Sequence, residues 1–259
     1  MKRVMAVANQ KGGVGKTTTA VNLSAALAAA NRAVLLIDLD PQGNASTHVG
    51  LASTDEQASS WDWFEGKAPL CDLVQRVPPG MDVVASNSDL TATEVRLLNA
   101  EDRVRRLRAL LDSENSYDYV IVDCPPTLNV LTLNALMAAS DVLIPMQCEY
   151  FALEGLTALM RTIDAVRSAG NPELRIDGII RTMYDPRNKL TRAVSRQLFD
   201  HFKSQVYRTV IPRNVRVAEA PSYGQPVNLY DRRSRGAIAH LALAQEMLRR
   251  HAQSEASHG

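Results

Sequence analysis

Short apolar runs alternate with helical patterns along almost the whole chain. The apolar runs, which predict strands, cover 3–9, 33–40, 81–85, 119–123, 141–147, 176–183 and 206–212. Helical patterns lie between them at 17–30, 91–112, 129–139, 153–169, 189–204 and 235–251. Because near-continuous valine, isoleucine and leucine favours strands buried on both faces, the pattern predicts an α/β fold with a mostly parallel sheet and helices on both faces. Nucleotides bind such sheets at the carboxyl ends of the strands.

One stretch, 50–79, fits neither pattern. It contains Trp61, Trp63 and Phe64. We interpret these aromatic residues as anchors of a long surface excursion, and we predict no site from them.

The length and composition are those of one domain. The chain has 259 residues, of which 46% are hydrophobic, and no repeat or low-complexity linker divides it, so we expect a single domain over 1–259. No apolar stretch approaches the roughly 20 residues of a membrane-crossing helix, and none fits a signal peptide, so we expect a cytoplasmic protein. Three scattered cysteines, Cys71, Cys124 and Cys148, indicate neither a disulfide framework nor a zinc site.

A glycine-rich segment at 10–18, QKGGVGKTT, joins the first predicted strand to the first predicted helix. It departs from the phosphate-binding pattern G-x-x-x-x-G-K-[ST] only at the first glycine, which is Gln10 here. Glycines let backbone N–H groups turn toward a phosphate, and the helix N-terminus adds a positive dipole end. We expect Lys16 to neutralise the β and γ phosphates and the Thr17 hydroxyl to bind Mg2+. The predicted nucleotide-binding residues of the loop are Lys11, Gly12, Gly13, Val14, Gly15, Lys16, Thr17 and Thr18.

Carboxylates close two of the predicted strands. Asp123 ends the run YVIVD, where a second metal-site element is expected to hold Mg2+ directly or through water. Asp38 and Asp40 end the run AVLLIDLD. A carboxylate at a neighbouring strand end can orient the attacking water, so we predict that Asp40 is catalytic and that Asp38 supports the metal shell. Helix capping or a turn before Pro41 is the alternative for both aspartates.

The extra lysine of the loop, Lys11, needs its own explanation. Lys16 already supplies the cation inside the site, so we predict that Lys11 reaches a phosphate bound in a second copy of the chain. A cation inserted in trans stabilises transition-state charge as an arginine finger does. The predicted consequence is ATP-dependent homodimerisation, with Lys11, Lys16 and Asp40 as the catalytic residues. A surface lysine with no partner is the alternative.

Charge is distributed unevenly although the whole chain has a formal charge of only +1. From 175 to 235 there are thirteen basic residues against five acidic ones, so the remainder is net negative by seven. This asymmetry predicts a basic face suited to the phosphate backbone of DNA, with an affinity that falls as salt rises. No recognition motif is visible, which favours binding without sequence preference. A set of solvated helix faces is the alternative.

The chain resembles the ParA/Soj family of partition ATPases, within the deviant-Walker class that also includes MinD and the nitrogenase iron protein. Besides the loop, the resemblance rests on DLDPQGN at 38–44, DCPP at 123–126, QCEYFALEG at 147–155, IPRNVR at 211–216 and EAPS at 219–222. These blocks follow one another in the family's order over nearly the whole length, which is far more specific than the loop alone.

The resemblance implies a P-loop NTPase-like fold, with ATP and Mg2+ as cofactors. It implies an ATP-sandwich dimer that binds DNA without sequence preference and leaves it after slow hydrolysis, stimulated by a ParB-type partner at a centromere-like site. Such a protein is nucleoid-associated. The resemblance also implies that Pro212 and Asn214 frame the adenine and that Arg187 and Arg216 occupy positions used for DNA contact. The loop begins ten residues from the start, so we expect no N-terminal winged-helix domain.

The main alternative is a MinD-like membrane-associated positioning ATPase. Such a protein would carry a C-terminal amphipathic helix rich in basic and bulky apolar residues. The corresponding stripe here is modest and favours a helix packed on the sheet, with no membrane contact. The stripe consists of Ala237, Leu241, Ala244 and Leu248.

Three other classes fit less well. A GTPase would need a guanine-reading Asn-Lys-x-Asp, whereas the nearest string, NKLT at 188–191, lacks the aspartate. A nitrogenase-type reductase would need cysteines for an iron–sulfur cluster shared by two chains, but Cys124 and Cys148 lie in the partition blocks. A scaffold that binds ATP without hydrolysing it is disfavoured by the presence of Lys16 and Asp40.

Overall fold

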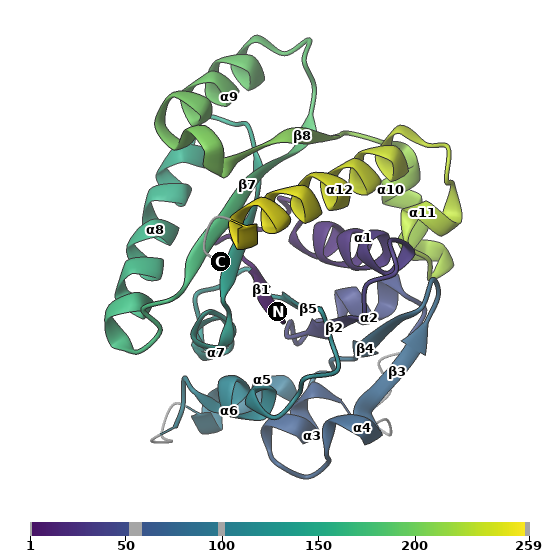
Figure 1. Ribbon diagram of the computed structural model, residues 1–259, viewed down its shortest axis with the longest axis vertical. Helices are drawn as coiled ribbons and strands as arrows, with labels where there is room; N and C mark the ends of the chain where they lie inside the picture. The colour runs from purple at the N-terminus through teal and green to yellow at the C-terminus, as the bar shows by residue number, and fades with distance from the viewer. Residues whose placement is uncertain (1, 52–58, 98–101, 257–259) are drawn as a thin grey trace.

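A single sheet with helices on both faces organises the molecule (Figure 1). The computed structural model describes residues 2–51, 59–97 and 102–256. Within them, eight strands lie in the order β3-β4-β2-β5-β1-β6-β7-β8. They are β1 (Arg3–Val7), β2 (Val34–Asp38), β3 (Val74–Val77), β4 (Met81–Val84), β5 (Tyr119–Asp123), β6 (Asp141–Gln147), β7 (Arg175–Tyr184) and β8 (Val206–Pro212). Only β3 and β4 pair in antiparallel fashion, so the predicted mostly parallel sheet is confirmed.

Helices connect the strands and cover both faces of the sheet. The N-terminal half contributes α1 (Lys16–Ala29), α2 (Asn44–His48), α3 (Ser60–Phe64), α4 (Leu70–Leu73), α5 (Leu90–Leu97), α6 (Arg106–Asp112) and α7 (Val130–Ala138). The remainder contributes α8 (Ala152–Ala169), α9 (Lys189–Phe202), η1 (Lys203–Gln205), α10 (Val215–Glu219), η2 (Ala220–Tyr223), α11 (Val227–Tyr230) and α12 (Arg235–Ala256). In Figure 1, α1 and α12 lie together on one side of the sheet, away from α7.

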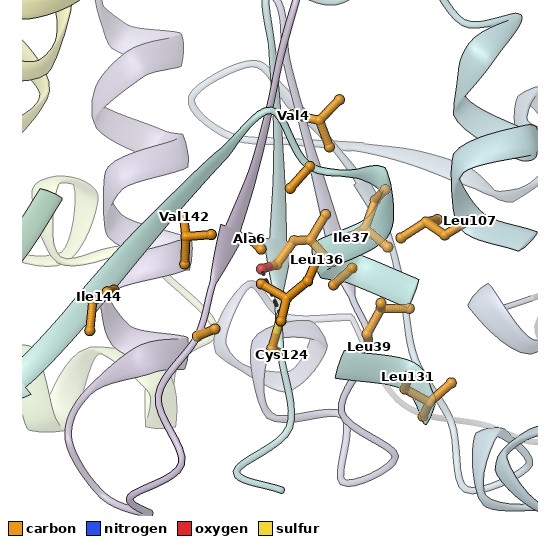
Figure 2. Close-up of a cluster of buried hydrophobic side chains, with 14 of the residues drawn as sticks. Val4, Ala6, Ile37, Leu39, Leu107, Cys124, Leu131, Leu136, Val142 and Ile144 are labelled. Carbon is orange, nitrogen blue, oxygen red and sulfur yellow. Dashed lines mark hydrogen bonds between the residues drawn. The ribbon is translucent and has the colours of Figure 1, made fainter. Parts of the chain in front are cut away.

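The core is divided into two layers by the alternation of side chains along each strand. Val4 and Ala6 of β1 belong to the layer shared with α7 and α8, whereas Met5 and Val7 belong to the layer shared with α1 and α12. Figure 2 shows part of the first layer, where Leu136 of α7 lies among side chains of the strands. Burial on both faces explains why the strands read as continuous apolar runs.

One prediction about an individual element was wrong, and the stretch that the sequence left unassigned contains regular elements. The single helix expected over 91–112 is two helices, α5 and α6, and the described residues before α6 form a turn. The unassigned stretch 50–79 contains α3, α4 and the edge strand β3, while its residues 52–58 lie outside the described residues. Trp63 and Phe64 of α3 are buried in the core, which agrees with their interpretation as anchors.

The last helix, α12, packs on the sheet and protects its edge. Ala237 and Ala244 are buried, and Leu241 and Leu248 are partly buried against the core, so the predicted packing of this stripe is confirmed. The Glu246 carboxylate accepts hydrogen bonds from the backbone N–H groups of Arg208 and Thr209 in the edge strand β8, both at 2.8 Å. No described helix is long and apolar enough to cross a membrane.

Candidate nucleotide site

The glycine-rich loop lies between β1 and α1, as the sequence predicted. Gly13 and Gly15 have φ angles of 71° and 87°, a left-handed conformation that a side chain would strain. α1 begins directly after Gly15, so its first N–H groups face the loop. Val14 is buried beneath the loop, and its carbonyl accepts a hydrogen bond of 2.7 Å from the Thr182 hydroxyl of β7. This contact fixes the height of the loop above the sheet.

A cavity of about 520 Å³ lies over the loop and the carboxyl ends of the strands. Its lining includes most of the residues predicted for the phosphates and for catalysis. These are Gly12, Gly13, Gly15, Lys16, Thr17, Thr18 and Asp40. The volume and the mixed basic and acidic lining are suited to a phosphate chain with its metal ion.

A second, mostly apolar pocket of about 230 Å³ adjoins this cavity. Pro212 and Asn214, the residues implied for adenine, both line it. The side-chain oxygen of Asn214 accepts a hydrogen bond of 3.3 Å from the backbone N–H of Val217, so it also caps α10. The structure therefore brings the predicted base residues next to the predicted phosphate loop.

Lys16 is buried at the start of α1, and its ammonium turns back over the loop. Its Nζ donates a hydrogen bond of 3.1 Å to the backbone carbonyl of Lys11. Burial lowers the pKa of Lys16, and the nearby negative groups, Asp123 first among them, oppose that shift. A phosphate would supply the compensating charge that this buried cation lacks.

Asp38 and Asp123 lie side by side because β2 and β5 are paired in register at these residues. Asp123 is fully buried, and neither of its carboxylate oxygens has a hydrogen-bond partner of ordinary length and angle among the described residues. Burial, reinforced by the negative charge of Asp38, raises the pKa of Asp123 well above its usual value. The neighbouring Thr17 hydroxyl offsets this only in part.

This arrangement fits Mg2+. Buried carboxylate oxygens without partners and a threonine hydroxyl at the loop are the hard oxygen donors that Mg2+ prefers. Among residues 2–51, 59–97 and 102–256, no group of three metal-binding side chains forms a complete cage. Since Mg2+ usually keeps waters and binds substrate phosphates as well, an incomplete protein shell agrees with this ion. The predicted roles of Thr17, Asp123 and Asp38 in metal binding stay predictions.

Asp38 has partners for both of its oxygens. Its Oδ1 accepts the backbone N–H of Asp40 at 3.1 Å, and its Oδ2 accepts the backbone N–H and the hydroxyl of Ser46 at 2.9 and 2.7 Å. Burial raises the pKa of Asp38 to about 6 although these hydrogen bonds oppose the shift. Asp38 thereby holds Asp40 and α2 in place, which suits the supporting role predicted for it.

Asp40 lines the cavity from the loop that follows β2. Its Oδ1 accepts a hydrogen bond of 3.0 Å from the backbone N–H of Gln42. Its Oδ2 accepts none from the residues that the structure describes. Its own carbonyl accepts the Ser86 hydroxyl at 2.7 Å, and the Ser86 N–H donates to the Ser46 hydroxyl oxygen at 2.9 Å. The carboxylate is therefore held by its neighbours and still faces the cavity, as a water-orienting group must.

Lys11 lies outside the cavity lining, and its ammonium forms an ion pair with Glu149 of the same chain. The side chains of Lys11 and Glu149 are 42% and 48% exposed, respectively. An ion pair this open to water contributes at most about 1 kcal/mol, so it opposes a move of Lys11 only weakly. Within one copy of the chain the partner of Lys11 is Glu149, and its predicted role in a second copy stays a prediction.

The two arginines implied for DNA contact lie apart from the nucleotide cavity, and both form ion pairs. Arg187 contacts both carboxylate oxygens of Asp185, at 3.0 and 2.8 Å, and its side chain is 89% exposed. Arg216 pairs with Glu219 at 2.8 Å and with Asp231 at 3.4 Å. These three carboxylates are among the five acidic residues already counted from 175 to 235, so the basic excess of this segment is unchanged, but neither arginine is free of a carboxylate partner.

Several residues of the cavity were not predicted. They are Gln42, Asn44, Thr47, His48, Pro126, Met183 and Pro221. Gln42 and Asn44 belong to the block after β2, and Pro126 and Pro221 belong to other blocks that carried the family resemblance, so a signal for them existed. Nothing local in the sequence pointed to Met183, which comes from β7.

Comparisons with known proteins identify the family of the chain. Residues 2–176 match the model of the AAA domain family. Over 252 residues, which cover 96% of this chain and 94% of the relative, the sequence is 52% identical to the chromosome partitioning protein ParA of Caulobacter vibrioides. The chain belongs to the ParA/Soj family of chromosome-partitioning ATPases. A second member, the sporulation initiation inhibitor protein Soj of Bacillus subtilis, is 45% identical over 249 residues, covering 95% of this chain and 98% of the relative.

Two solved structures with similar folds extend the comparison. The cobyrinic acid a,c-diamide synthase of Mycobacterium smegmatis, solved with an ATP analogue and magnesium, has a TM-score of 0.86 and 38% identity, with 96% of this chain and 95% of that chain covered. The cell division ATPase MinD of Pyrococcus furiosus has a TM-score of 0.78 and 26% identity, with coverage of 96% and 99%. The predicted P-loop NTPase-like fold is confirmed.

Proposed function

We propose that this chain is a DNA-partition ATPase that uses ATP and Mg2+ to alternate between a DNA-bound dimer and a free monomer. The observation that carries the proposal is that a buried Lys16 ammonium and a buried Asp123 carboxylate without a hydrogen-bond partner lie at a cavity that adjoins an apolar base pocket. ATP and Mg2+ satisfy both groups. The 52% identity to a chromosome partitioning ParA favours partition over the chemistry of the 38% identical diamide synthase.

In this proposal, ATP is held between two copies of the chain, and each copy contributes Lys11 to the phosphates of the other. Release of Lys11 from Glu149 costs little because the pair is exposed. Asp40 then orients water, and hydrolysis is slow until a ParB-type, centromere-binding partner stimulates it. Loss of the γ phosphate removes the charge that holds the two lysines across the interface, so the dimer separates and leaves the DNA.

Substitution of Lys11 by alanine tests the contribution across the dimer. The Lys11→Ala variant is expected to keep MgATP binding within about tenfold, because Lys16 remains, but to stay monomeric at protein concentrations where the wild type dimerises. Light scattering with ATP and with ADP, in the absence of DNA, measures this. Lys189→Ala, an exposed lysine outside both nucleotide pockets, is the matched control and should dimerise normally. An ATP-dependent Lys11→Ala dimer would exclude the role in trans.

DNA is proposed to bind the basic surface near the end of β8. A groove of about 1040 Å³ there is lined by Arg187, Arg208, Arg213 and Arg235, with Asp185 as its one acidic lining residue in the described chain. Phosphate contacts from such a surface need no sequence preference, and their affinity falls with salt. Two copies in one dimer double the surface, which ties DNA affinity to ATP and explains nucleoid association.

The deciding experiment is a DNA titration with ADP, ATP and a slowly hydrolysed analogue. Wild-type protein should bind random-sequence DNA tightly only with ATP or the analogue, and Arg187→Glu/Arg216→Glu should weaken that binding at least tenfold while dimerisation persists. Arg76→Glu/Arg96→Glu is the matched control, since both arginines are exposed, ion-paired and on other elements of the fold. Equal binding with ADP would remove the nucleotide switch, and unchanged binding by the double variant would move the DNA surface elsewhere.

The MinD-like alternative requires a membrane-binding helix, and the buried apolar stripe of α12 argues against it. A flotation assay with anionic vesicles and ATP separates the two functions. Partition predicts that the protein stays with DNA and does not float with vesicles, whereas ATP-dependent flotation would favour the alternative.

A further inference from the structure

Met183 has a backbone conformation that needs a specific reason. In residues 2–51, 59–97 and 102–256, three residues other than glycine have positive φ angles: Asn31, Met183 and Lys203, at 58°, 47° and 43°. Asn31 lies just after the end of α1, where a left-handed residue commonly closes a helix, and Lys203, with φ 43° and ψ −111°, lies where α9 gives way to η1. Met183 instead lies inside strand β7. Left-handed residues other than glycine are costly and cluster at functional sites.

The strand is irregular at this point. The register between β7 and β8 shifts between Arg181 and Tyr184, on either side of Met183. Bulges of this kind re-aim a side chain next to an active site. The consequence is visible in the lining of the two nucleotide pockets. Only Gly15, Thr18 and Met183 border both of them in the described chain.

The Met183 side chain is held by a neighbouring strand, and the residue before it is tied to the phosphate loop. The Gln147 side-chain amide, at the end of β6, donates to the Met183 sulfur at 2.9 Å. The preceding residue, Thr182, is paired with Gln147 in the sheet and donates its hydroxyl to the loop carbonyl of Val14. The thioether is therefore fixed relative to the phosphate loop, at the junction where the phosphate cavity meets the base pocket.

We propose that Met183 is a nucleotide-positioning residue whose thioether packs against the sugar and base of the bound nucleotide. If the phosphates of a nucleotide lie over the loop and its base lies beside Pro212, the ribose between them must lie at this junction. Methionine is suited to the contact because it is unbranched, polarizable and able to follow a curved apolar surface. The inference rests on the proposed binding of ATP, and it adds that part of the affinity depends on the nucleoside and not on the phosphates.

The test compares MgATP with inorganic tripolyphosphate, which carries the phosphates without a nucleoside. Met183→Gly is expected to weaken MgATP binding about tenfold in calorimetry while the Kd of magnesium tripolyphosphate changes less than about twofold. Met183→Leu, which keeps apolar bulk, should recover most of the MgATP affinity. Lys203→Gly is the matched control: it also replaces a residue with positive φ by glycine, far from both pockets, and should change neither affinity.

Glycine tolerates the conformation of Met183, so the variant is expected to fold, and its thermal unfolding checks this. If Met183→Gly binds MgATP as tightly as the wild type, the conformation serves only the β7–β8 bulge and the inference is wrong. Equal weakening of both ligands would also overturn it, because it would indicate a displaced loop. Failure of the wild type to bind MgATP at all would instead overturn the proposed function.

Discussion

Replacement of Asp40 by alanine is expected to lower kcat for ATP hydrolysis by roughly 10²- to 10⁴-fold while MgATP still binds. Asp40 faces the cavity with one carboxylate oxygen, whereas the phosphate-binding groups, the Lys16 ammonium and the N–H groups of the loop, are untouched. Without turnover the dimer cannot separate, so the variant should remain on DNA after ATP is added. Phosphate release under saturating ATP, together with DNA dissociation kinetics after dilution, measures both effects.

Two controls keep this result specific. Asp164→Ala removes an exposed carboxylate on α8 that pairs with Arg167, and it should leave turnover unchanged. Asp40→Asn keeps the side-chain oxygen that accepts the Gln42 N–H, so it separates loss of the charge from loss of the turn. If Asp40→Ala hydrolyses ATP at the wild-type rate, the orienting carboxylate must be another residue. If it binds MgATP poorly, Asp40 acts in binding.

The phosphate loop could be predicted because its chemistry is local. Glycines, a lysine and a threonine at fixed spacing between a strand and a helix define the loop, and the structure has the same elements in the same order. The carboxylates at strand ends could also be predicted, since the carboxyl ends of parallel strands meet at one edge. Asp38 and Asp123 lie in register for that reason.

Elements with a weaker pattern could not be predicted. Strand β3 contains Gln75 and Arg76 in its four residues and lies at the edge of the sheet, where one apolar face is enough. It therefore lacks the continuous apolar run that marked the inner strands. The pattern over 91–112 is helical on both sides of the turn, so it did not indicate where the helix breaks.

Contacts between distant parts of the chain were equally hidden. Lys11 and Glu149 are 138 residues apart, and only the folded sheet brings the loop next to the end of β6. The ion pair of Arg216 with Asp231, which partly neutralises the basic segment, also could not be predicted. It forms only because η2 and α11 bring the chain back to Arg216. A count of charges cannot distinguish an arginine that faces DNA from one that already has a carboxylate.

Replacement of Asp123 by asparagine is expected to stabilise the ligand-free protein and to abolish hydrolysis. The raised pKa of Asp123 means that the folded state holds its proton more tightly than the unfolded state. That contribution to stability is present below the unfolded pKa, near 3.9, and is lost as pH rises through the folded pKa. At pH 8 Asp123 is ionised in the unfolded state, so the wild type folds against the cost of burying that charge or of taking up a proton, and the neutral amide avoids both costs.

At pH 8 the unfolding temperature of the ligand-free variant should exceed that of the wild type by about 2–4 °C for each kcal/mol of stability gained. This difference between variant and wild type should become smaller toward pH 5. MgATP turnover should fall at least about a hundredfold, because the charge that faces the metal is gone. Asp141→Asn is the matched control with the opposite expectation. Asp141 is also buried but pairs with the buried Arg3 at 3.3 Å, so its neutralisation leaves Arg3 only the exposed Glu255 as a charged partner and lowers stability at the same pH. If both variants lose stability, Asp123 must have a stabilising partner in the ligand-free protein. The hypothesis that its carboxylate has no partner until Mg2+ binds would then be wrong.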